Sequence, residues 1–164
     1  MRKIGIVMGS DSDLPVVQGA ANILDRLGVP YEVHVYSAHR TPEAAIDFAK
    51  NAREKNFGVI IAFAGMAAHL AGVLAANTII PVIGVACSGK LLDGMDALLS
   101  TVQMPSGIPV ATVAVNGGVN AALLAAQILA VEDHDLARKL DAKRISDSAK
   151  VLEKDAALQA ELNP

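Results

Sequence analysis

The chain has 164 residues, of which 52% are hydrophobic and 19% are charged, and its net charge is −3. This length suits one domain with a buried core, and the lack of a basic stripe excludes a typical nucleic-acid-binding protein. The one cysteine, Cys87, excludes an internal disulfide and a cysteine-rich metal site, and it fits a reducing compartment. We therefore expect a cytoplasmic protein. The mean hydropathy of +0.40 is high for a soluble monomer, so we also expect apolar surface that is covered in a homo-oligomer.

Short apolar runs alternate with helical patterns along the chain. The runs typical of buried strands cover 4–8, 31–36, 59–63, 82–86 and 110–115. The helical patterns cover 14–27, 42–55, 67–76, 95–102 and 120–131, and a charged helical tail in one or two pieces follows from 134. Gly28 is expected to end the first helix, and Thr41 and Pro42 to begin the second. The alternation predicts an α/β fold in which helices cover both faces of a parallel sheet.

The stretch 57–76 is apolar except for His69, which makes a membrane span an alternative interpretation. Three glycines punctuate this stretch, and β-branched residues fill only its first part. We therefore predict a buried strand followed by a buried helix, and no membrane partner. The first apolar run of the chain is too short for a signal peptide.

Polar clusters follow the first three predicted strands, at the end where a parallel sheet binds ligands. They comprise Gly9, Ser10 and Asp13 after the first strand, Ser37, His39 and Arg40 after the second, and Gly65 and His69 after the third. Neighbouring strands would bring these clusters into one cleft. Each cluster also has a structural interpretation, as helix caps, a solvated arginine or satisfied structural histidines. His34 and His134 are expected to be structural or solvated.

Other catalytic motifs are incomplete or absent from the sequence. Residues 84–90 match the phosphate-loop pattern GxxxxGK, but Leu91 follows where a magnesium-binding Ser or Thr is required. No GxGxxG follows the first strand, and neither the HExxH zinc motif nor the GxSxG hydrolase motif occurs. Cys87 directly follows a strand, where a buried inert thiol and a reactive nucleophile are the alternatives.

Five segments occur in an order and at a spacing that identify a family. They read MGSDSD, SAHRTP, AGxAAHLxG, DALLSTVQMPSGIPV and NAALLAAQILA, between residues 3 and 131. In these segments the chain resembles the PurE family, the 5-(carboxyamino)imidazole ribonucleotide mutases of purine biosynthesis. The resemblance implies one domain, a flavodoxin-like three-layer α/β/α sandwich over 1–131 with a helical tail over 132–164. It also implies a homo-octamer to which the tail contributes contacts.

The implied activity is an isomerase reaction on a phosphorylated aminoimidazole riboside. The carboxylate would move from the exocyclic nitrogen to ring carbon C4, with no ATP, metal or organic cofactor. By this resemblance His39 is the general acid and base. The expected substrate contacts are Gly9, Ser10 and Asp13 at the ribose phosphate end, Ser37 and Arg40 at the phosphate, and Gly65 and His69 around the CO2.

The chain departs from the family pattern at a few positions. Residues 63–72 read FAGMAAHLAG where many members read GAGGAAHLPG, so Met66 replaces a glycine and Ala71 a proline. Met66 places a side chain in a loop expected to face the substrate. A branch of the family that carboxylates aminoimidazole ribonucleotide with free CO2 reads SAHKT and lacks AAHLxG, so the SAHRT of this chain favours the mutase. That carboxylase, and a non-catalytic nucleotide-binding module on the same fold, are the alternatives.

Overall fold

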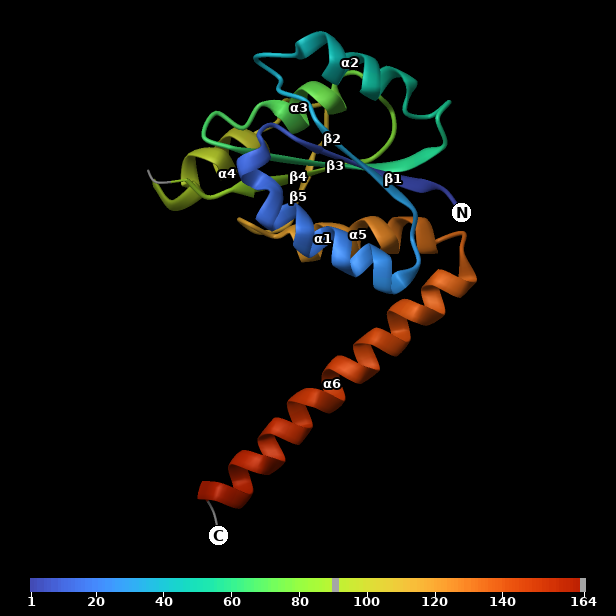
Figure 1. Ribbon diagram of the computed structural model, residues 1–164, viewed down its shortest axis with the longest axis vertical. Coiled ribbons are helices and arrows are strands. Elements are labelled where there is room, and N and C mark those ends of the chain that lie inside the picture. The colour runs from blue at the N-terminus through green and yellow to red at the C-terminus, as the bar shows by residue number, and fades with distance from the viewer. Residues whose placement is uncertain (90–91, 163–164) are drawn as a thin grey trace.

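The computed structural model describes residues 1–89 and 92–162, and in them five parallel strands form one sheet (Figure 1). The strands are β1 (Lys3–Met8), β2 (Tyr31–Val35), β3 (Phe57–Gly65), β4 (Val82–Cys87) and β5 (Ala111–Thr112). Their order in the sheet is β2-β1-β3-β4-β5. This is the strand order of flavodoxin-like proteins, so the predicted fold class is confirmed.

The described residues also form six α-helices. These are α1 (Leu14–Leu27), α2 (Pro42–Asn51), α3 (Leu70–Ala75), α4 (Met95–Val102), α5 (Gly118–Ala130) and α6 (His134–Leu162). Helices α1 and α5 cover one face of the sheet, and α2, α3 and α4 cover the other (Figure 1). Three layers result, as the alternation of strands and helices predicts.

The period of the strands decides which side chains enter each layer. Ile4 and Ile6 of β1 pack with α1 and α5 on one face of the sheet. The next residue, Val7, points to the other face and packs with α2 and α3. In β3, Ile61 joins the first cluster and Ile60 the second. Because both faces are covered, the central strands carry apolar residues at consecutive positions.

Some element boundaries differ from the sequence-based prediction. Strand β5 is only two residues long instead of spanning 110–115, because Ala114 has a φ of 81° and leaves the extended region. Helix α2 ends at Asn51, and a turn with left-handed Asn56 leads to β3. Helix α3 begins at Leu70 rather than at 67. Apolar periodicity locates these elements, but local backbone geometry sets their ends.

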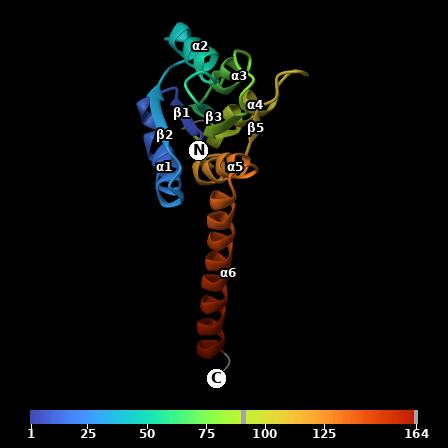
Figure 2. The same cartoon turned by 90° about the vertical axis from the view of Figure 1, so that its right-hand side faces the viewer.

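Helix α6 is a single helix of 29 residues that extends away from the α/β layers (Figures 1 and 2). Near its start Leu136 and Leu140 are buried in the core, and Lys139 donates a 2.7 Å hydrogen bond from Nζ to the Leu27 carbonyl at the end of α1. Beyond Leu140 the described residues are exposed, apart from the half-buried Lys143. Within residues 1–89 and 92–162, no helix combines the length and the apolarity needed to cross a bilayer.

The register of the sheet places the ends of the first strands at one edge. Met8, the last residue of β1, pairs with Val35 of β2 on one side and with Phe63 of β3 on the other. Gly65, the last residue of β3, pairs with Cys87 of β4. Strand order reverses between β1 and β3, so the loops that follow these strands diverge to opposite faces and leave a crevice between them.

We expect Gly84→Ala to destabilise the protein, because a Cβ at this position of β4 would clash with Thr101 Cγ2 of α4. Overpacking of this kind costs about 1–3 kcal/mol. The matched control is Gly19→Ala within α1, whose Cβ would meet only the Val119 side chain at 3.5 Å. This control is expected to gain about 0.5–1 kcal/mol, since alanine favours helices. Urea unfolding of both variants measures the difference, and equal midpoints would contradict the close approach of α4 to β4.

Candidate active site

A cleft of about 470 Å³ opens at the carboxyl ends of β1 to β4. Its lining residues are Gly9, Ser10, Ser12, Asp13, Ser37, Ala38, His39, Arg40, Ala64, Gly65, Met66, Ala67, Leu70, Ser88 and Gly89. This volume suits a small-molecule ligand. The three predicted polar clusters therefore meet, and the expected site residues line this cleft, except for His69, which is not part of the lining but contacts His39.

The loop after β1 forms a short 3₁₀ turn, Asp11–Asp13, before α1 begins. Ser10 caps this turn, because its hydroxyl accepts a hydrogen bond from the Ser12 N–H at 3.3 Å, and the Ser12 hydroxyl donates to the Ser10 hydroxyl at 2.9 Å. Asp13 occupies the N-cap position of α1 but makes no capping hydrogen bond with its side chain. Capping therefore explains Ser10 and leaves Asp13 for another role.

Asp13 and Cys87 form a buried pair beneath the cleft. Burial raises the pKa of the Asp13 carboxyl, although hydrogen bonds from the Cys87 thiol and from the Ser10 N–H oppose the rise. Burial and the neighbouring Asp13 raise the pKa of the Cys87 thiol to about 12. At neutral pH the thiol is protonated, so Cys87 is an inert donor and not a nucleophile.

The loop after β2 is organised by its own hydroxyl groups. The Ser37 hydroxyl accepts from the backbone N–H groups of His39 and Arg40 at 3.3 and 3.2 Å. The Thr41 hydroxyl accepts from the Ser37 N–H at 2.8 Å. Thr41 is the N-cap of α2, as predicted, but its side chain binds back to Ser37 rather than into the helix. These bonds fix the backbone from which His39 and Arg40 extend.

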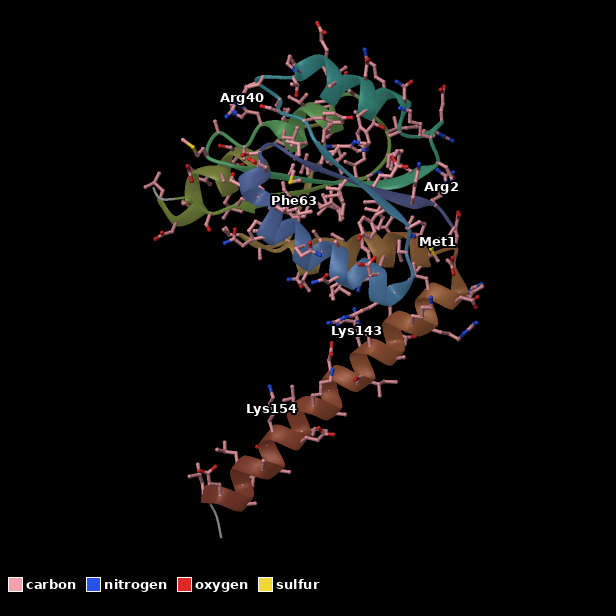
Figure 3. All side chains as sticks on the ribbon, in the orientation of Figure 1. Met1, Arg2, Arg40, Phe63, Lys143 and Lys154 are labelled. Carbon is pink, nitrogen blue, oxygen red and sulfur yellow. The ribbon has the colours of Figure 1, made fainter. Side chains whose placement is uncertain are left out.

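Arg40 is exposed and extends outward from the loop before α2 (Figure 3). Among the ion pairs of the described residues, none involves Arg40. A guanidinium with no carboxylate partner at the rim of a cleft is suited to bind an anionic group of a ligand.

His39 and His69 are in direct contact although 30 positions separate them in the chain. The Nε2 atom of His39 lies 2.9 Å from Nδ1 of His69, and the two rings meet edge to face at 84°. One nitrogen of the pair must carry a proton for this hydrogen bond to form. The contact therefore joins the loop after β2 to the start of α3 and gives the cleft a pair of imidazoles that share a proton.

Met66 follows β3 with a left-handed backbone, at a φ of 54°. Such a conformation costs a non-glycine residue on the order of 1–2 kcal/mol. A Cβ at the preceding Gly65 would lie 3.2 Å from the Cys87 carbonyl oxygen, so a side chain there would require the neighbouring backbone to shift slightly.

The loop after β4 contributes Ser88 and Gly89, which sequence reasoning missed as cleft residues. Asn116 holds this loop: its Oδ1 accepts from the Ser88 N–H at 2.9 Å, and its Nδ2 donates to the Ser88 hydroxyl at 2.7 Å. In the sequence, the turn-forming residues Asn116, Gly117 and Gly118 were the feature that could have indicated this contact. The GxxxxGK pattern ends at Lys90, which with Leu91 lies outside the described residues.

The remaining histidines are placed as expected. His34 stacks on Tyr36 and its Nδ1 lies 3.2 Å from the Tyr36 hydroxyl, away from the cleft. His134 is exposed at the start of α6. Neither residue lines the cleft, and their structural or solvated role stays a prediction.

Comparison with known proteins gives consistent matches over most of the chain. The model of a family described as AIR carboxylase matches residues 3–150. The N5-carboxyaminoimidazole ribonucleotide mutase of Pyrococcus horikoshii is 56% identical over 92% of this chain and 88% of its own length. The enzyme of the same name from Bacillus subtilis is 57% identical over 92% and 94%. The crystal structure of PurE from Treponema denticola superposes with a TM-score of 0.85 at 29% identity, covering 98% of both chains.

We expect Asp13→Asn to make the protein more stable at neutral pH. The folded state raises the pKa of Asp13 above its ordinary value of 3.8, so the folded state binds the proton more tightly than the unfolded state. The ionised carboxylate therefore opposes folding at pH 7, and this cost disappears as the pH falls through the folded pKa toward 3.8.

Thermal unfolding at pH 7 and at steps down to about pH 4 measures this difference, which is expected to shrink toward the acid end. Asp11→Asn is the control, since Asp11 is the exposed neighbour on the same turn. An Asp13→Asn protein that is less stable than the wild type at pH 7 would contradict the cost of burying this carboxylate.

Proposed function

The chain belongs to the AIR carboxylase family, and on that premise we propose that it is an N5-carboxyaminoimidazole ribonucleotide mutase of purine biosynthesis. Its reaction moves a carboxylate from the exocyclic nitrogen of the substrate to ring carbon C4. The observation that carries the proposal for the site is that His39 lines a cleft suited to a small ligand and is in contact with His69.

The chemistry needs a proton donor, a proton acceptor and a closed space. In the first step the carbamate nitrogen is protonated, the N–C bond breaks with its electron pair returning to nitrogen, and CO2 is released. In the second step C4 of the aminoimidazole attacks this CO2, a C–C bond forms, and C4 loses its proton. The proton gained in the first step is balanced by the proton lost in the second, and no redox change occurs.

His39 is proposed as the group that gives the first proton and accepts the last. Imidazole is the side chain best suited to exchange protons at neutral pH. The His69 Nδ1, 2.9 Å from the His39 Nε2, orients the ring and provides a place for the shared proton. Both histidines lie in segments whose backbone is held by hydrogen bonds. The two rings are therefore preorganised for proton transfer.

The remaining lining groups are proposed to hold the ribose phosphate. The Asp13 carboxylate can accept hydrogen bonds from ribose hydroxyls, beside Ser10 and the backbone at Gly9. Arg40 is proposed to bind the phosphate. The Ser37 hydroxyl accepts two hydrogen bonds from the backbone of its own loop, at His39 and Arg40. Ser37 is therefore proposed to position these two residues as well as to contact the phosphate.

The main rival is an aminoimidazole ribonucleotide carboxylase that uses free CO2 in the same cleft. The motif SAHRT and the segment AAHLxG favour the mutase. A non-catalytic nucleotide-binding module has no need for a pair of imidazoles that share a proton. These three functions differ in their carbon source and in their dependence on His39.

We also propose a homo-octamer that acts in the cytoplasm. Helix α6 carries Lys154 far from the α/β layers (Figure 3), and exposed apolar side chains occur along the helix. These exposed apolar residues are Ile145, Val151, Leu152, Leu158 and Leu162. An isolated helix with so many exposed apolar residues is stabilised by packing against other subunits.

Leu152→Glu is expected to dissociate the assembly, because it places a charge within this apolar surface. Light scattering measures the mass of both proteins, and the wild type is expected near eight times the 17.0 kDa of one chain. Glu153→Gln on the same helix is the control. A monomeric wild type would contradict the octamer.

The proposed activity is tested with two substrates in the absence of ATP. The purified protein is given N5-carboxyaminoimidazole ribonucleotide, and separately aminoimidazole ribonucleotide with bicarbonate, while absorbance of the C4-carboxylated product is followed. A mutase turns over the first rapidly and the second only at very high bicarbonate. Efficient use of dissolved CO2 would assign the chain to the carboxylase instead.

In the same assay His39→Asn is expected to lower turnover by about 10²–10⁴-fold, while product binding measured by calorimetry changes little. Asparagine keeps a similar shape but cannot exchange the proton. His134→Asn, at the exposed start of α6, serves as the control. Turnover that survives in His39→Asn would exclude the proposed proton-transfer role.

A further inference from the structure

Met66 is unusual in both its backbone and its side chain. Its φ of 54° lies in the region that favours glycine, and its side chain is 68% exposed at the lining of the cleft. In the described ranges, the other non-glycine residues with positive φ lie outside this lining. Strained backbone gathers at ligand clamps, so an outlier at a cleft points to a role there.

The backbone around Met66 is fixed although its side chain is free. The Met66 carbonyl accepts a hydrogen bond from the Ala68 N–H at 2.9 Å. On the other side, Gly65 packs against the Cys87 carbonyl too closely to admit a Cβ without a shift. The loop therefore sets the point from which the exposed thioether chain extends at the cleft.

Met66 is also the long apolar side chain that the cleft presents to solvent. The other apolar lining residues are three alanines, Ala38, Ala64 and Ala67, and Leu70, which is only 2% exposed. An unbranched thioether is flexible and fits irregular apolar surfaces. It can cover a bound ring while presenting no hydrogen-bond donor and only a weak acceptor.

We propose that Met66 is an apolar cover that folds over the bound heterocycle and retains the CO2 released in the first step. This inference rests on the proposed mutase activity and concerns how the two half-reactions are coupled. CO2 is small and apolar and has no hydrogen-bond donor, so polar lining groups hold it poorly. A thioether above it excludes water and keeps CO2 beside C4 until the C–C bond forms.

Loss of the cover has a defined chemical consequence. CO2 that escapes after the N–C bond breaks leaves free aminoimidazole ribonucleotide, whose nitrogen has kept the proton. If C4 then captures CO2 from solution, the product carries a carbon that did not come from the substrate. Retention is therefore measured by the origin of the carboxylate carbon and by the amount of decarboxylated ribonucleotide released.

The first experiment supplies unlabelled N5-carboxyaminoimidazole ribonucleotide in buffer that contains ¹³C-bicarbonate and carbonic anhydrase. Mass spectrometry at early times gives the ¹³C content of the product and the free aminoimidazole ribonucleotide, after subtraction of an enzyme-free sample. Wild type is expected to transfer mostly the original carbon. Met66→Gly is expected to raise both quantities about threefold or more, because water and CO2 then pass freely.

Two further variants separate the side chain from the backbone. Met66→Leu keeps an apolar side chain in the same loop and is expected to restore most of the retention. Asn56→Gly replaces a left-handed residue, φ 64°, at the opposite end of β3, and is expected to leave the origin of the carbon unchanged. A Met66→Gly protein with wild-type retention, or a Met66→Leu protein that leaks equally, would overturn the cover.

A second experiment does not depend on turnover. Hydrogen peroxide converts exposed methionine to its sulfoxide, and peptide mass spectrometry follows each methionine separately. Saturating C4-carboxylated product is expected to slow oxidation of Met66 severalfold and to leave Met95, which is 53% exposed outside the cleft lining, unaffected. Equal oxidation rates of Met66 with and without product would overturn the proposal.

The two proposals fail separately. A wild-type protein that turns over neither substrate would overturn the mutase activity whatever the oxidation of Met66 shows. A wild-type protein that is an efficient mutase, but leaves Met66 equally exposed with product bound, would overturn the cover alone.

Discussion

The parallel pairing of β1 with a strand on each side is the constraint on which the site depends. Because Met8 is in register with both Val35 and Phe63, β1 and β2 end level with each other and β3 ends two residues further on, so the loops after all three strands begin at one edge of the sheet. A shift of one residue in either pairing would separate the His39 and His69 rings, which are fixed at 2.9 Å by loops on different strands. The packed core on both faces of the sheet therefore determines whether two histidines from distant parts of the chain can share a proton.

Much of the fold and part of the site could be predicted from the sequence. Apolar runs and helical periodicity located the strands and helices, and the polar residues after each strand indicated the ligand-binding edge. The contact of His39 with His69 could not be predicted from periodicity, because it depends on strand order, which the residues alone do not encode locally. Ser88 was missed for a related reason: its place in the cleft depends on Asn116, which lies 28 positions away. The premature end of β5 follows from the backbone of Ala114, which no property of alanine reveals.

The site is built at a cost to the stability of the fold. A buried carboxylate at Asp13 and a left-handed backbone at Met66 are both unfavourable, and each occurs at the lining of the cleft. Left-handed non-glycine residues also occur outside the cleft lining, at Asn56, Leu92, Asp93, Ala114 and Asn116. Met66 differs from them because its strained backbone lies at a ligand-binding cleft, where strain is expected when ligand binding opposes stability.

Because Cys87 is buried, the reactivity of its thiol depends on local opening of the structure around it. With a pKa of about 12, roughly one thiol in 10⁵ is ionised at neutral pH in the closed structure, so alkylating reagents find almost no thiolate there. Reaction requires an opening that exposes the thiol beneath the loops after β1 and β3. Because the chain has one cysteine, the rate of its alkylation reports how often the structure around Cys87 opens. A ligand that stabilises the closed structure in this region will lower the alkylation rate, and no probe has to be introduced to measure it.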